Sequence, residues 1–340
     1  MEQPLAGRRK PFRRFAGWLV VLAVLPAVAA GLWFWLYAVG AGPAGAETMV
    51  YIPPGSSFAA VEDTLVESGV LREDQRFHWL AAASGLRSRL RAGEYAVPAG
   101  ASPLEVLQLV ASGRTVARRV TIPEGANLYQ VSGLLADQQL LEAEDFVAYA
   151  TDPETPDRFQ LDSPTLEGWL FPDTYHFTRG QSQEEITAVM VRGARRVLEE
   201  LLAEHGNGTG LNELEIMTLA AIVEKETGRA EERAKIAGVF FNRLELGMRL
   251  QTDPTVIYGR QSFDRRLTRE DLRTPTPYNT YVIHGLPPGP IANPGREAIA
   301  AVLDPEDTDY LYFVSRNDGS HQFSTNLRDH NRAVNRYQRR

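Results

Sequence analysis

The stretch Ala220-Ala221-Ile222-Val223-Glu224-Lys225-Glu226-Thr227 decides how the C-terminal part of this chain folds. Within 216–223 only Thr218 is polar, so we expect a helix that is buried on every side. Asn212 is followed three residues later by Glu215, a capping box that places the start of this helix. Gly228 is its predicted end.

Two carboxylates end this apolar run. Glu224 and Glu226 are two positions apart, about 200° around a helix axis, so they point to nearly opposite sides. Burial raises the pKa of a carboxyl and keeps its proton on, as a general acid requires. Glu224 shares its face with the small pair Ala220-Ala221, which leaves room for a ligand, and is the candidate acid. The alternative for Glu224 is a buried carboxylate in an ion pair. For Glu226 we expect an ion pair with Arg229 or Arg233.

The composition excludes several kinds of site. The chain has 340 residues, of which 44% are hydrophobic and 23% charged, as in globular domains. It has no Cys, which excludes disulfides, thiolate metal sites and a Cys nucleophile. The six His show no metal-ligand spacing, and the sequence has neither a nucleophile elbow nor a phosphate-binding Gly loop. We therefore expect acid–base chemistry by carboxylates, with no cofactor and no metal.

Residues 1–39 predict a membrane anchor. Five basic residues within 1–14 precede an uncharged and almost wholly apolar stretch, 15–39, which is long enough to cross a bilayer as a helix. The basic flank predicts a cytoplasmic tail over 1–14, with the rest of the chain outside the cytoplasm. A signal peptide cleaved near residues 44–46 is the alternative, although its apolar core is usually only about 7–15 residues long. The exported part has a formal charge of −11, which disfavours nucleic acid as a partner.

Turns that contain Pro and Gly divide the exported part. Three similar segments each join a strand end to an amphipathic helix, so the sequence predicts an α+β fold with helices packed on short sheets. The predicted N-caps of these helices are Ser57, Ser102 and Asn127. Near the C-terminus, Asn317-Asp318-Gly319 lies between two apolar runs and predicts a hairpin.

Polar side chains in the loops near the central helix are candidate substrate ligands. For each of them the alternative is hydrogen bonding within its own loop. The aromatic segment 167–175 is either a packed loop or one wall of a cleft, since aromatic rings stack on sugar faces. The candidates are Glu167, Asp173, Glu226, Gln251, Asp253, Thr255, Tyr258, Tyr278, Asn279 and Asn326.

Several motifs are specific enough to suggest a family. They are Ile222–Thr227, Val239–Leu244, Gly247–Gly259, Thr276–Tyr281, Gly285–Ile291, Glu167–Tyr175 and Asn326–Asn331. In these segments the chain resembles the endolytic murein transglycosylases, the YceG-like family. The resemblance implies a single-pass protein of the inner membrane with a cytoplasmic N-terminus. It further implies a small LysM-like α+β module over 47–118 and a larger catalytic domain over 119–340.

The resemblance also implies an activity. The family cleaves the β-1,4 bond between MurNAc and GlcNAc inside nascent peptidoglycan strands and leaves a 1,6-anhydro-MurNAc end. Its catalytic glutamate is expected at Glu224, first as general acid and then as general base. The implied partners are glycan strands and the membrane, with peptidoglycan synthases and divisome or elongasome proteins as further candidates. Two alternatives stay open: a non-catalytic peptidoglycan-binding scaffold, and a hydrolytic muramidase whose second carboxylate is Asp173, Glu167 or Asp253.

Overall fold

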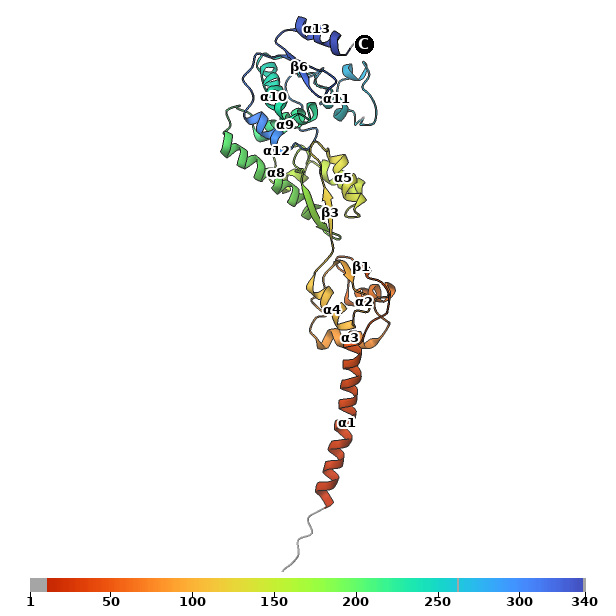
Figure 1. Ribbon diagram of the computed structural model, residues 1–340. Coiled ribbons are helices and arrows are strands. Elements are labelled where there is room, and N and C mark those ends of the chain that lie inside the picture. The colour runs from red at the N-terminus through yellow and green to blue at the C-terminus, as the bar shows by residue number, and fades with distance from the viewer. Residues whose placement is uncertain (1–10, 262, 339–340) are drawn as a thin grey trace, which may run out of the picture. The chain divides into compact units, whose positions relative to one another are not determined.

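The computed structural model describes residues 11–261 and 263–338 (Figure 1). Helices and short strands alternate along the chain, which confirms the predicted mixture of helix and sheet. The chain divides into two compact units. Unit 1 consists of Met1–Ala117 with Thr178–Gly180, and unit 2 of Arg118–Phe177 with Gln181–Arg340.

Unit 1 is built on one antiparallel strand pair, β1 (Thr48–Ile52) and β2 (Gly93–Val97), in which Thr48 lies opposite Val97. Three helices pack around the pair: α2 (Phe58–Glu67), α3 (Gln75–Ala83) and α4 (Pro103–Ser112). Ser57 and Ser102 accept hydrogen bonds from the first turns of α2 and α4, as predicted for N-caps. The core of the unit is apolar, with Phe77 and Tyr95 among its fully buried side chains.

Helix α1 (Pro11–Val39) covers the segment for which the sequence predicts a membrane span. Among the residues that the structure describes, no helix combines the length and the hydropathy of a membrane span. The C-terminal end of α1 packs into unit 1, because Phe34, Tyr37 and Ala38 contact its core. The guanidinium of Arg76 also lies 4.3 Å from the ring centres of both Trp33 and Tyr37.

Unit 2 contains all but the end residues Ala117 and Thr178 of the two-stranded sheet of β3 (Ala117–Thr121) and β4 (Thr174–Thr178). The segments between and after these strands are helical. They form α5 (Leu128–Asp137), α6 (Ala143–Thr151), α7 (Thr155–Arg158) and the long α8 (Gln183–His205). Asn127 caps α5 with the capping box expected from the sequence.

The central helix of unit 2 is α9 (Glu213–Glu226), and every residue from Ile216 to Val223 is buried. This confirms the predicted helix, including the capping box of Asn212 and Glu215. The helix ends at Glu226, and its C-cap Thr227 has an extended backbone (φ −143°, ψ 137°), so Gly228 lies directly after the helix end as predicted. Around α9 pack α10 (Ala230–Glu245), α11 (Asp253–Gly259) and α12 (Arg296–Leu303).

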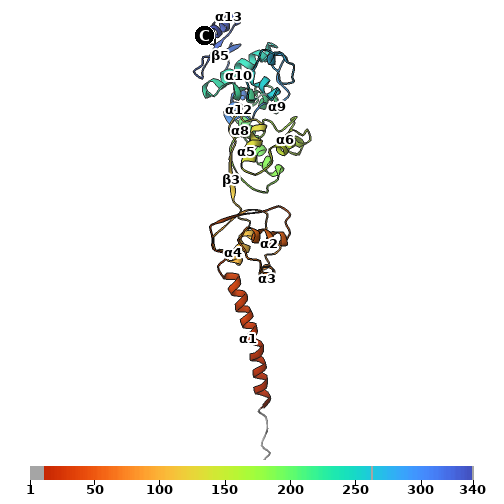
Figure 2. The same cartoon turned by 90° about the vertical axis from the view of Figure 1, so that its right-hand side faces the viewer.

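The C-terminal end of unit 2 is a hairpin covered by a helix, seen from two sides in Figures 1 and 2. Strands β5 (Tyr312–Ser315) and β6 (His321–Ser324) are antiparallel, and α13 (Leu327–Tyr337) packs on both. The predicted hairpin turn is confirmed, since Asn317 and Gly319 adopt positive φ angles of 65° and 83°. A short 3-10 helix, η1 (Asp271–Arg273), follows α11.

Candidate active site

A cleft of about 720 Å³ opens in unit 2 where the end of α9 meets the start of α11, the β5–β6 hairpin and α13. These elements are far apart in sequence, so the cleft exists only in the folded unit. Its lining is mainly polar, as expected of a site that binds a hydrophilic ligand. The titratable side chains among the described residues that line it are Glu226, Arg243, Asp253, Tyr281, Tyr312, His321 and His330.

Glu226 is the last residue of α9 and opens into this cleft. Its Oε1 accepts a hydrogen bond from the hydroxyl of Thr252. Burial raises the pKa of Glu226 to about 7, and the nearby charge of Asp253 acts in the same direction. The Thr252 hydrogen bond and the charges of His321 and Arg243 oppose this rise. Burial thus moves the titration of this carboxyl from its ordinary range toward neutral pH.

A network of threonines holds the backbone of Thr252, the residue whose hydroxyl hydrogen-bonds to Glu226. The backbone N–H of Thr252 donates to Oγ1 of Thr280 at 3.0 Å. The hydroxyls of Thr255 and Thr280 lie 2.8 Å apart, and Thr255 also donates to the carbonyl of Thr252 at 2.7 Å. Thr255 is fully buried, so the predicted substrate ligand is in fact part of the scaffold behind the cleft.

Gln251 and Asp253 do line the cleft, as the sequence predicts for substrate ligands. Gln251 has a positive φ of 50°, an uncommon backbone for a residue other than Gly, and its N–H donates to the carbonyl of Thr280 at 3.2 Å. Asp253 accepts a hydrogen bond from the phenol of Tyr281 at 2.7 Å. These contacts place two polar groups on the wall next to Glu226.

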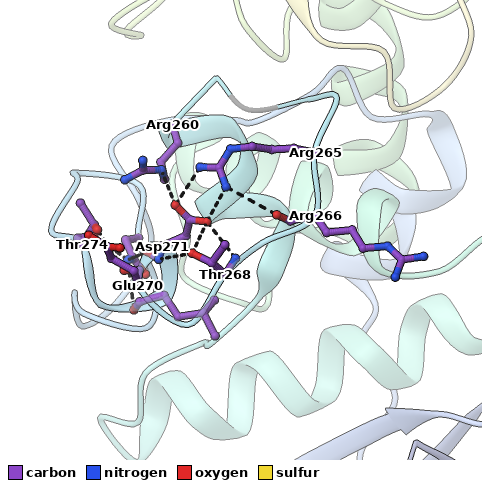
Figure 3. Close-up of polar contacts among 9 residues, drawn as sticks. Arg260, Arg265, Arg266, Thr268, Glu270, Asp271 and Thr274 are labelled. Carbon is purple, nitrogen blue, oxygen red and sulfur yellow. Dashed lines mark hydrogen bonds and ion pairs between the residues drawn. The ribbon is translucent and has the colours of Figure 1, made fainter.

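The wall that carries Tyr281 is held from behind by Asp271, a residue that the sequence did not single out. Figure 3 shows its carboxylate between Arg260 and Arg265, with Oδ atoms 2.7–2.8 Å from the nitrogens of both and from Thr268. These contacts hold the pKa of Asp271 well below its usual range, chiefly through Arg265. Asp271 therefore stays charged and clamps the loop that follows α11.

Asn279 connects the loop that Asp271 clamps to the cleft wall. Its Nδ2 donates to the carbonyls of Asp271 (3.2 Å) and Thr274 (2.7 Å), and its Oδ1 accepts the N–H of Tyr281 (2.9 Å). Asn279 is fully buried, so it is not a substrate ligand as predicted but a support for one. The alternative given by the sequence, hydrogen bonding within the loop, holds here.

Glu224 is not among the described residues that line the cleft. Its side chain is 7% exposed, and its oxygens lie 3.6 Å from the guanidinium of Arg233 and 3.2 Å from the amide of Gly295, which donates to it. Burial raises the pKa of Glu224, while the Gly295 bond and Arg233 act against the rise. Arg233 was predicted to pair with Glu226, and that prediction is wrong. The other predicted partner, Arg229, pairs with Glu231.

A second buried carboxyl, Glu167, sits in a different cluster. Both of its oxygens accept the N–H of Leu128, at 3.0 and 3.2 Å, and Nδ2 of Asn293 lies 3.3 Å away. Burial raises the pKa of Glu167 to about 8, against hydrogen bonds that include one with Tyr258. The ring of Tyr278 lies 5.0 Å from that of Tyr258. The predicted residues Glu167, Tyr258 and Tyr278 are thus brought together, but they tie core segments and lie apart from the cleft lining.

The last two predicted ligands also lie outside the cleft lining. Asp173 is exposed and accepts the N–H of Thr174 at 2.6 Å. Asn326 is the N-cap of α13, where its Oδ1 accepts the N–H of Asp329 at 3.0 Å. Its helix nevertheless contributes His330 and Asn331 to the cleft.

Several cleft residues were missed by the sequence reasoning. Arg243 is buried, and its guanidinium donates to the carbonyls of Leu311 (2.7 Å) and Leu250 (2.6 Å). His321 stood out only as one of six scattered His. No pattern in the sequence indicates either residue. Both reach the cleft of Glu226 through the packing of the folded unit. Over 11–261 and 263–338, no group of His, Asp and Glu side chains is arranged to hold a metal.

Comparison with known proteins shows which family the chain belongs to. The YceG-like family matches residues 50–336. The chain belongs to the YceG-like family. It is 35% identical over 305 residues to the endolytic murein transglycosylase of Bacillus subtilis, covering 85% of this chain and 84% of that protein. It is 30% identical over 317 residues to the endolytic murein transglycosylase of Streptococcus pneumoniae, covering 84% of this chain and 57% of that protein.

A solved structure is also similar. A crystal structure of a YceG-like protein from Listeria monocytogenes aligns with 84% of this chain and 98% of its own, with a TM-score of 0.58 and 33% identity. The predicted family is thereby confirmed, and the mixed helix and sheet fold matches that of a YceG-like protein.

Proposed function

We propose that this chain is an endolytic lytic transglycosylase of peptidoglycan glycan strands, with Glu226 as its proton donor. The observation that carries the proposal is the position of Glu226, at the end of a buried helix and open to a polar cleft. Its pKa of about 7 makes both protonation states available at neutral pH. A group that first gives and then takes a proton needs both states.

One carboxyl is sufficient for this reaction. Protonated Glu226 gives its proton to the glycosidic oxygen as the bond from that oxygen to C1 of MurNAc breaks. The resulting carboxylate removes the proton of the C6 hydroxyl of the same sugar, and O6 bonds to C1. The product is a 1,6-anhydro ring, no water is consumed, and Glu226 is protonated again. The nucleophile belongs to the substrate and is already positioned, which lowers the entropic cost of the step.

We prefer Glu226 to the predicted Glu224 because of what each carboxyl faces. A proton donor must reach its substrate, and Glu226 lines the cleft whereas Glu224 lies against Arg233 and Gly295. The hydrogen-bond partner of Glu226 is a neutral hydroxyl, that of Thr252, and burial raises the pKa of the carboxyl despite the opposing charges of His321 and Arg243. Glu224 beside a cation is the arrangement that the non-catalytic alternative predicts for that residue.

The relatives support the substrate class. Proteins of Bacillus subtilis and Streptococcus pneumoniae that match most of this chain are named endolytic murein transglycosylases. We extend the proposal to location: residues 15–39 form a single-pass anchor in the inner membrane, and the units that follow lie outside the cytoplasm. The uncharged sequence of that segment and its basic flank support the extension. The LysM-like module over 47–118, the catalytic domain over 119–340 and binding to peptidoglycan synthases belong to the same proposal.

A hydrolytic muramidase is the second candidate, and one observation favours it. Asp253 lines the cleft together with Glu226, and a hydrolytic glycosidase needs two carboxylates. In the hydrolytic mechanism Asp253 activates water or forms a covalent intermediate. The product then carries a reducing end in place of the anhydro ring.

The ends of the product decide between these candidates. Uncrosslinked glycan strands are digested with the wild type, Glu226→Gln and Glu224→Gln, and the new ends are identified by mass spectrometry. Anhydro ends made by the wild type and by Glu224→Gln, and absent with Glu226→Gln, support the proposal. Reducing ends support the muramidase. Normal turnover by Glu226→Gln removes Glu226 from the mechanism, and loss with Glu224→Gln alone returns the role to Glu224.

A further inference from the structure

A carboxylate–imidazole pair lies in the wall of the cleft and has no role in the reaction described above. Glu232, on α10, faces His321, the first residue of β6. Oε1 of Glu232 accepts the backbone N–H of His321 at 2.9 Å, and Oε2 lies 2.7 Å from Nδ1 of its ring. The two side chains are only 11% and 12% exposed. His321 also lines the cleft that contains Glu226.

These contacts determine the state of the ring. A carboxylate only accepts hydrogen bonds, so Nδ1 must be the donor to Oε2. Nε2 is then the nitrogen left for another partner, as in sites where a carboxylate orients a functional imidazole. The ring is also packed edge-on against Phe313, with centroids 5.5 Å apart and planes at 90°. The orientation of His321 is thus fixed from two directions.

The location of the pair is hard to explain by stability alone. Withdrawing a carboxylate from water is costly, and an apolar pair of the same size would serve a hairpin wall as well. A single acceptor would satisfy the backbone N–H of His321. The second oxygen of Glu232 serves only the ring, and the ring is at the cleft.

We propose that His321 hydrogen-bonds the glycan strand through Nε2, and that Glu232 is the residue that positions it. The inference rests on the proposed function of this cleft and adds a substrate contact to it. A neutral imidazole accepts a hydrogen bond from a sugar hydroxyl through Nε2, and a protonated one donates to a sugar oxygen. Glycan strands offer both groups along their whole length.

Two amide substitutions of His321 separate its two nitrogens. The amide nitrogen of Asn is as many bonds from the backbone as Nδ1, so His321→Asn keeps a group for Glu232 and loses the one for the strand. The amide nitrogen of Gln corresponds to Nε2, so His321→Gln keeps the strand group and loses the bond to Glu232. His176→Asn, at an exposed position of β4, is the matched control.

The test measures kcat and KM for anhydro-end formation on uncrosslinked strands. The same His321 substitutions are placed in the Glu226→Gln background, and the Kd for strands is measured without turnover. We expect His321→Asn to lower kcat/KM and to raise Kd by about tenfold, the effect of one lost hydrogen bond, and His321→Gln to lose less. Glu232→Gln offers one acceptor to two donors, so we expect an intermediate loss.

A purely structural role reverses this order. His321→Asn would then resemble the wild type, and His321→Gln would be impaired and would unfold at a lower temperature. That result overturns the inference even if the wild type makes anhydro ends. A wild type that makes no anhydro ends defeats the proposed function, and the Kd series still decides whether His321 contacts the strand.

Discussion

The last turn of α9 has two sides, and the carboxyls on them have different neighbours. Glu224 and Glu226 are two residues apart, and burial raises the pKa of both. On one side Glu224 lies against a cation, Arg233, and the backbone amide of Gly295. On the other side Glu226 holds the neutral hydroxyl of Thr252 at the edge of an open cleft. Under the proposed function, burial alone does not make a catalytic acid, because the carboxyl also needs access to substrate.

The strongest test of this comparison exchanges the two carboxyls for amides, one at a time. We expect Glu226→Gln to lower kcat by about 10³-fold, the size of a lost general acid, because an amide cannot donate and recover the proton. We expect Glu224→Gln to stay within about tenfold of the wild type in kcat. The rate of anhydro-end formation measures both. Equal losses in the two variants would mean that the sides are not distinct.

On the Glu224 side, we expect substitution of Arg233 to lower the free energy of unfolding. Arg233→Met leaves Glu224 buried without its cation, and breaking a buried pair on one side costs about 3 kcal/mol of unfolding free energy. Urea unfolding measures this loss. In the double variant with Glu224→Gln we expect most of it to be recovered, since the buried carboxylate is gone and only the half-exposed Glu124, 3.9 Å from Arg233 in the wild type, stays without its cation. A loss that the second substitution does not restore would assign the effect to packing.

The helix and the directions of its two carboxyls could be predicted from the sequence, because they depend only on residues close together in the chain. The apolar run of α9, its cap at Asn212 and the opposite directions of the two carboxyls all depend on residues within a few turns. Which side is open depends on distant segments. The turn at Gly125, far earlier in the chain, lies beside Glu224, where an added Cβ would be 3.4 Å from Cγ of Glu224.

The dependence on distant segments also explains why some predicted loop ligands proved to be buried. Thr255 and Asn279 are polar residues in motif-rich loops, like Gln251 and Asp253, yet they bond inward and are fully buried. Polarity shows that a side chain needs a partner but not whether the partner is the protein or a ligand. His321 and Arg243 reach the cleft only because β6 and α10 pack near the end of α9, which no spacing along the chain reveals.

The pH dependence of the Glu226 side gives a third test. With a folded pKa of about 7, well above its usual value, Glu226 loses its proton as the pH rises through 7, so the rate should fall above that pH. The groups around it are Asp253, His321 and Arg243, and only Asp253 raises its pKa by charge. We therefore expect Asp253→Asn to move the falling limb to lower pH. A limb that moves upward, or a pH-rate profile without a limb near 7, would contradict this assignment.

The raised pKa also has a consequence for stability. A group whose folded pKa is raised stabilises the fold fully below its unfolded value and loses that contribution as the pH rises through the folded value. For Glu226 the window runs from its ordinary value of 4.5 to about 7. Above that window the wild type holds a poorly solvated carboxylate, which Glu226→Gln lacks. We expect this variant to melt at a higher temperature than the wild type at pH 8, with the difference vanishing at pH 4.

The smallest expected effect is that of removing the Asp271 carboxylate, which holds the loop behind the cleft wall. Asp271 clamps the loop after α11, and Asn279 connects that loop to Tyr281 and the cleft. The pKa of Asp271 is lowered, so its contribution is present above its unfolded pKa and is lost only as the pH falls toward the folded value. We expect Asp271→Asn to loosen the loop equally at pH 6 and pH 8. Trypsin should then cut faster at Arg265 and Arg266, with kcat reduced only a few-fold because Thr252 still holds Glu226. Asp264→Asn, at an exposed position of the same loop, should change neither, and equal cutting in the two variants would show that the clamp does not order the loop.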